Sequence, residues 1–122
     1  MERLTQPEED ALRVLWTLPA GGFVKGVLDA LPPPPPPYTT LASTLRNLER
    51  KGYVRAEKLG NSYRFVPVVS ADDYQRRSLG TLVQQHFQNS YKELVSFFAQ
   101  EEKISAADLQ EILDLIERKK AE

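Results

Sequence analysis

The stretch from Tyr38 to Gly52 constrains the fold most strongly, because it separates the two faces of a helix. Leucines recur there at helical spacing and predict a buried stripe of Leu41, Leu45 and Leu48. The opposite face carries short polar and cationic side chains, which can approach a charged, hydrogen-bonding surface such as the DNA major groove. For an isolated helix, a merely solvated face is the simpler interpretation. The residues of that face are Thr39, Thr40, Ser43, Arg46, Asn47 and Arg50.

The sequence after this helix predicts a β-hairpin. Two runs of alternating character, residues 53–59 and 62–67, flank the turn pair Gly60-Asn61. A helix that runs directly into a hairpin with basic residues near its tip is typical of a winged helix-turn-helix, in which helix and wing bind adjacent parts of one duplex. We therefore expect a recognition helix at about residues 39–51 and a wing at about residues 53–67.

The charge distribution agrees with this expectation, although the total charge does not. Sixteen basic and seventeen acidic residues give a net charge of −1, which alone argues against a strongly basic nucleic-acid binder. Residues 38–66, however, contain six basic and two acidic side chains, whereas residues 71–122 contain seven basic and ten acidic ones. Positive charge is therefore concentrated where the helix and hairpin are expected, and chance clustering is the alternative explanation.

The N-terminal part predicts two more helices. Thr5, Pro7 and Glu8 form a capping-box signature for the first helix, in which Trp16 is interpreted as a core anchor. A second, short helix is expected over residues 23–31. The six prolines from Pro32 to Pro37 then exclude a helix. We favour a stiff connector over a polyproline ligand for a partner domain, because the run is short and internal.

Beyond Pro67 the pattern predicts three helices to the end of the chain, with caps at Ser70, at Asn89 or Ser90, and at Ser105 with Asp108. These roughly fifty residues carry more apolar surface than three helices can hide alone, which favours a homodimer. The apolar residues assigned to dimerisation are Leu79, Leu82, Val83, Phe87, Leu94, Phe97, Phe98, Leu109, Ile112, Leu113 and Ile116.

Several function classes are disfavoured by composition. Without cysteine the chain has no disulfides and no zinc-thiolate site, and one histidine, His86, cannot form a metal site alone. No Gly-rich phosphate loop or paired-carboxylate motif is present, so we expect neither an enzyme nor a cofactor. No signal peptide or apolar span of about 20 residues is found, which predicts a soluble, cytoplasmic protein without membrane insertion.

The order of these elements resembles the penicillinase-repressor family of bacterial transcriptional repressors over nearly the whole chain. The resemblance depends on three segments: Leu4-Thr5 with residues 9–16, Tyr38-Thr39-Thr40-Leu41 with Lys51-Gly52-Tyr53-Val54, and residues 70–74 before the tail. It implies a mainly α fold with a small β-hairpin wing, divided into a winged-helix DNA-binding domain (residues 1–69) and a three-helix dimerisation region (residues 70–122). It also implies a homodimeric repressor that binds a palindromic double-stranded DNA operator.

The resemblance assigns roles by position. Thr39, Thr40, Ser43 and Asn47 face the major groove and its bases, while Arg46, Arg50 and Lys58 suit phosphates. In the wing, Asn61, Ser62 and Arg64 contact the backbone beside the groove. The competing hypothesis is a winged-helix module that binds another protein without sequence-specific DNA binding.

Two departures from the family pattern concern the release of DNA. Antibiotic-responsive members are cleaved at an Asn-Phe bond in the tail after a membrane sensor-protease is activated, and here the matching pair is Phe97-Phe98. Copper-responsive members carry paired cysteines, which this chain lacks. The sequence thus leaves open both the inducing signal and a sensor-protease partner.

Overall fold

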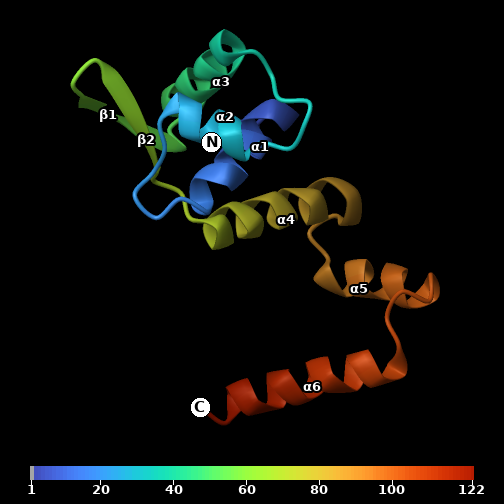
Figure 1. Ribbon diagram of the computed structural model, residues 1–122. Coiled ribbons are helices and arrows are strands. Elements are labelled where there is room, and N and C mark those ends of the chain that lie inside the picture. Colours follow the sequence, from blue (N-terminus) through green and yellow to red (C-terminus); the bar gives the residue numbers. More distant parts are fainter. Residues whose placement is uncertain (1) are drawn as a thin grey trace. The chain divides into compact units, whose positions relative to one another are not determined.

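The computed structural model describes residues 2–122 and contains six helices and one two-stranded antiparallel sheet (Figure 1). Contacts divide the chain into two compact units, of which the first ends at Gln75 and the second begins at Arg76. The predicted fold class, a mainly α winged helix with a hairpin, is confirmed. The elements are α1 (Gln6–Trp16), α2 (Val24–Ala30), α3 (Tyr38–Arg50), β1 (Val54–Leu59), β2 (Ser62–Pro67), α4 (Ala71–Phe87), α5 (Tyr91–Gln100) and α6 (Ala106–Lys120).

Local capping signals fix where several helices begin. At α1 the Thr5 hydroxyl accepts a hydrogen bond from the Glu8 backbone N–H, and the Glu8 carboxylate accepts one from the Thr5 N–H, which is the predicted capping box. Ser105 and Asp108 repeat this arrangement at α6. Ser90, one of two predicted candidates, caps α5. These helix starts are confirmed. They could be predicted from the sequence because a cap involves only residues three positions apart.

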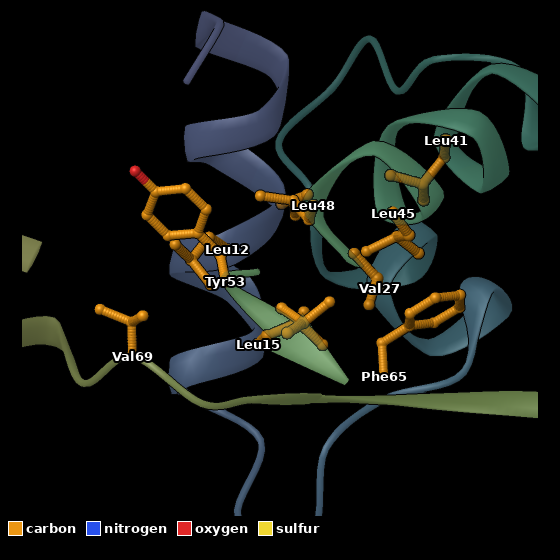
Figure 2. Packing of buried hydrophobic residues seen from close by; sticks show 11 residues of the cluster. Leu12, Leu15, Val27, Leu41, Leu45, Leu48, Tyr53, Phe65 and Val69 are labelled. Atoms are coloured by element: carbon orange, nitrogen blue, oxygen red, sulfur yellow. The ribbon is translucent and has the colours of Figure 1, made fainter. Parts of the chain in front are cut away.

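One hydrophobic core holds the first unit together. Figure 2 shows Leu45 and Leu48 of α3 gathered with Leu12 of α1, Val27 of α2 and Phe65 of β2. The three leucines predicted as the buried stripe of α3 are 0–2% exposed. Burying a leucine side chain fully contributes about 1.5–3 kcal/mol. This core therefore fixes which face of α3 points outward.

The hairpin is joined to the helices at its base. Gly22 pairs with Phe65 through two backbone hydrogen bonds of 2.8 and 2.9 Å. A Cβ atom at Gly21 would lie 2.6 Å from the Phe65 carbonyl oxygen, and Gly21 has a φ of +83°, so glycine is required there. Phe65 is 2% exposed and anchors β2 in the core. The base of the wing is thus fixed by backbone pairing and by burial.

Lys51 joins the end of α3 to the beginning of α1. Its ammonium group lies 2.6 Å from the Glu8 carboxylate and 2.9 Å from the Arg3 carbonyl oxygen. The side chains of Lys51 and Glu8 are only 9% and 4% exposed. Burial alone raises the pKa of Glu8, but hydrogen bonds from Lys51 and Thr5 and the positive charge of Lys51 outweigh it, so the pKa lies below its ordinary value of 4.5.

This depressed pKa predicts a component of acid sensitivity. A carboxylate whose pKa is lower in the folded chain contributes stability that is fully present above pH 4.5 and is lost as the pH falls through the folded pKa. We expect the difference in free energy of unfolding between wild type and Glu8→Gln to shrink below that pH. Urea unfolding of both proteins between neutral pH and about pH 3 measures the difference. A constant difference over this range would contradict the assignment.

Candidate nucleic-acid interface

The outward face of α3 is polar and unobstructed within the described chain. Its six predicted side chains lie opposite the buried leucines and are all exposed. They are Thr39, Thr40, Ser43, Arg46, Asn47 and Arg50. The separation of the two faces is confirmed, whereas the DNA contacts of these side chains stay a prediction.

Pro37 positions the first turn of α3. It has φ −59° and ψ 150°, and its carbonyl oxygen accepts the hydrogen bond from the Leu41 N–H at 3.0 Å. No side chain in the described part of the chain caps this end of the helix. The proline run thus ends directly at the first helical residue, Tyr38, and its fixed φ angles reduce the conformational entropy that the chain loses there.

The wing tip is a two-residue loop, as predicted. Leu59 pairs with Ser62, which leaves Gly60 and Asn61 in the turn, and Gly60 has a φ of +64°. Glycine at the first loop position is what a type II′ turn requires. Lys58, Asn61 and Ser62 are exposed, so three of the predicted wing residues are accessible to a ligand.

Arg64 is less accessible than the other predicted wing residues. Its register partner across the hairpin is Glu57, and the guanidinium lies 3.5 Å from that carboxylate. The Arg64 side chain is 30% exposed, and its Nε has no hydrogen-bond partner among residues 2–122. Arg55 also lies 3.5 Å from Glu57. Contact with a phosphate would therefore require Arg64 to exchange one anionic partner for another.

Arg46 makes contacts that the sequence did not predict. Its guanidinium lies over the Tyr63 ring, 4.2 Å from the centroid, and 5.6 Å from the Phe65 centroid. It also forms an ion pair of 3.1 Å with Glu49. Among residues 2–122, Arg50 by contrast has one ion pair, with Glu2 at 3.4 Å, and both side chains are 61% exposed. Such a surface pair stabilises little and is easily broken by a ligand.

A pocket lies between the beginning of α2, α3 and the hairpin. Lys25 is one of its lining residues and was not among the predicted residues, because nothing near residue 25 in the sequence distinguishes this lysine from a solvated one. Its ion pair with Asp29, at 2.9 Å, is exposed. The pocket is lined by Phe23, Val24, Lys25, Tyr38, Arg46, Asn61, Ser62, Tyr63 and Phe65.

The tail helices expose their apolar residues. Within the described chain, neither α5 nor α6 contains a buried residue. Of the residues predicted to form the dimer, Val83 is buried within the single chain, and Phe87, Leu94 and Leu109 are half-buried. The others are 39–48% exposed; they are Leu79, Leu82, Phe97, Phe98, Ile112, Leu113 and Ile116.

Phe97 and Phe98 lie inside α5, where their ring centroids are 5.6 Å apart. Phe97 also packs edge-on against Phe87, at 5.9 Å. The peptide bond between the two phenylalanines is therefore helical. Proteolysis there would first require α5 to unwind, because proteases cleave extended backbone.

The described part of the chain shows no clustered metal ligands. No group of three or more His, Cys, Asp or Glu side chains in residues 2–122 is arranged to hold a metal ion. None of the helices in that range is long and apolar enough to cross a membrane.

A helical core that presents a polar helix beside a two-stranded hairpin defines a winged-helix protein of the DNA-binding, transcription-regulating class. The protein-family model for the penicillinase repressor matches residues 4–118. The chain therefore belongs to the penicillinase-repressor family, which consists of transcriptional regulators and not of enzymes. A comparison with curated proteins found no match.

Proposed function

We propose that this protein is a homodimeric, sequence-specific repressor that binds a palindromic operator. The observation that carries the proposal is the exposed polar face of α3 beside the wing, in a chain of the penicillinase-repressor family. In this proposal α3 enters the major groove and the wing lies along the adjacent backbone. Residues 1–69 form the DNA-binding domain and residues 70–122 form the dimer.

The chemistry of the α3 face supports a division of roles. Thr39, Thr40, Ser43 and Asn47 carry hydroxyl and amide groups, which exchange hydrogen bonds with base edges. In the described part of the chain Arg50 has a single, exposed ion pair, so its guanidinium is available for a phosphate. Base contacts then provide specificity, and cationic contacts provide salt-dependent affinity.

The exposed apolar surface of the tail supports the dimer. Aromatic and aliphatic side chains from α4, α5 and α6 remain about half exposed in the single chain. A concentration of large, exposed apolar side chains in one small unit favours a protein interface in soluble proteins. A twofold dimer would present two copies of α3 to two half-sites, which matches a palindromic operator.

Replacing Thr40 and Ser43 with alanine tests the base contacts. We expect the double variant to lose about 1–3 kcal/mol of discrimination per lost base contact and to keep its salt-dependent binding to unrelated duplexes. Fluorescence anisotropy titrations against the upstream region of its own gene and a scrambled duplex, repeated across salt, measure both quantities.

Ser78→Ala combined with Thr81→Ala is the matched control, because it makes the same chemical changes on the exposed surface of α4. This control should leave discrimination unchanged. If the Thr40 and Ser43 variant discriminated as well as wild type, base recognition by this face would be refuted. If wild type bound all duplexes equally, the protein would be better explained as a protein-interaction module.

A further inference from the structure

We propose that Arg46 is a positioning residue that holds the wing against α3, and not a phosphate ligand. The inference rests on the proposed DNA binding and assigns to Arg46 a role different from that of the other cations on the same face. Its elements are the Arg46 guanidinium, the Tyr63 ring of β2 and the Glu49 carboxylate of α3. These three groups are called the wing clasp below.

In the wing clasp the Arg46 guanidinium group contacts two partners, an aromatic ring and a carboxylate. Its Cζ atom lies over the Tyr63 ring, 4.2 Å from the centroid, within the range of a cation–π interaction. Its edge donates a 3.1 Å hydrogen bond to Glu49, one turn further along α3. Glu49 thereby orients the guanidinium over the ring. A planar, delocalised cation suits this stacked position, and a lysine ammonium does not.

The position of Tyr63 in the hairpin gives the wing clasp its effect. Phe65 fixes the base of the wing through burial and through its pairing with Gly22. Tyr63 lies two residues closer to the tip, on the same face of β2, and is only half-buried. An isolated two-stranded hairpin is marginally stable in water. A contact at Tyr63 therefore restricts the tip, where Lys58, Asn61 and Ser62 are exposed.

The difference between Arg46 and Arg50 supports the assignment. Both lie on the outward face of α3, but among residues 2–122 Arg50 has one long ion pair, whose side chains are 61% exposed. Arg46, by contrast, already contacts an aromatic ring and a carboxylate, which hold its guanidinium against the wing. Ordering the wing before DNA arrives reduces the entropy lost on binding, so the wing clasp strengthens operator binding without touching DNA.

Arg46→Lys separates the two roles, because it keeps the positive charge and loses the planar stack. A positioning role predicts that operator affinity falls about threefold to tenfold in both Arg46→Lys and Arg46→Ala. A phosphate ligand predicts that Arg46→Lys retains affinity, while Arg46→Ala lowers the salt slope by about one. Retained affinity in Arg46→Lys would overturn the proposal.

A double-mutant cycle with Tyr63→Leu provides the second test. If Arg46 acts through the ring, adding Arg46→Ala to Tyr63→Leu should weaken binding by less than about twofold further. If the losses of operator affinity caused by the two single substitutions multiplied in the double variant, the proposal would be overturned. Tyr63→Phe is the matched control, since it keeps the aromatic face and removes only the hydroxyl. It should bind within about twofold of wild type.

Amide hydrogen exchange tests the wing clasp without DNA, so its failure is distinguishable from failure of the proposed function. Arg46→Lys and Arg46→Ala should accelerate exchange at the backbone amides of Ser62 and Arg64, which face β1 in the alternating antiparallel pattern, and Tyr63→Phe should not. Unchanged exchange in both Arg46 variants would refute the wing clasp even if wild type bound its operator specifically. Faster exchange in a protein without operator preference would refute only the proposed function.

Discussion

Ile112→Asp is expected to dissociate the proposed homodimer into monomers and to lower its operator affinity about 10²–10⁴-fold. Ile112 lies on α6 and its side chain is 45% exposed in the single chain. Its neighbours Leu113 and Ile116 are each 48% exposed. In a dimer these side chains would be covered. A carboxylate placed among them would then lose its hydration without gaining a partner.

The large effect on DNA binding follows from valency. When one subunit of a dimer is bound to its half-site, the second subunit is held at high local concentration near the other half-site. A monomer loses this advantage although its own contacts are intact. The substituted residue lies outside the first unit, so α3 and the wing should keep their structure.

Analytical ultracentrifugation and anisotropy titrations measure the two consequences separately. Gln110→Asp is the matched control, because it adds the same charge to the exposed polar face of α6. It should stay dimeric and bind its operator normally. If Ile112→Asp remained a dimer with normal affinity, the apolar face of α6 would not form the interface.

Lys51→Met is expected to lower the free energy of unfolding by about 3–5 kcal/mol, because it leaves the buried Glu8 carboxylate without its cation. The ammonium group of Lys51 lies 2.6 Å from Glu8, and both side chains are almost fully buried. A methionine fills similar space, so loss of packing contributes little. Combining Lys51→Met with Glu8→Gln should recover part of the loss, since no buried charge then remains unpaired.

Urea denaturation at neutral pH measures the expected change. Lys25→Met is the matched control, because the Lys25–Asp29 pair is 73% and 62% exposed. That substitution should change stability by less than about 1 kcal/mol. Equal effects at the two lysines would contradict the role assigned to the buried pair.

The sequence was sufficient for features that depend on nearby residues. Thr5 and Glu8 define the beginning of α1, and Ser105 with Asp108 defines that of α6, because each cap involves residues three positions apart. The leucine spacing predicted the buried face of α3, and Gly60-Asn61 predicted the turn of the hairpin. The order of these elements then indicated the penicillinase-repressor family, which the match to residues 4–118 confirms.

The sequence could not predict which charged side chains already interact with another residue of the folded chain. Lys51 was counted with the basic residues of the proposed DNA-binding surface, but it lies buried against Glu8, 43 positions earlier in the chain. Arg46 was assigned to phosphates, but it lies over Tyr63 of the wing. Neither contact has a local pattern, because each joins elements that meet only in the folded chain.

The sequence alone therefore determined the helices, the hairpin and the polar face of α3, since periodicity and capping act over a few residues. The tertiary structure decided which cations in residues 38–66 already have a partner, because pairing with Glu8 or stacking on Tyr63 depends on how α1, α3 and β2 pack around one core.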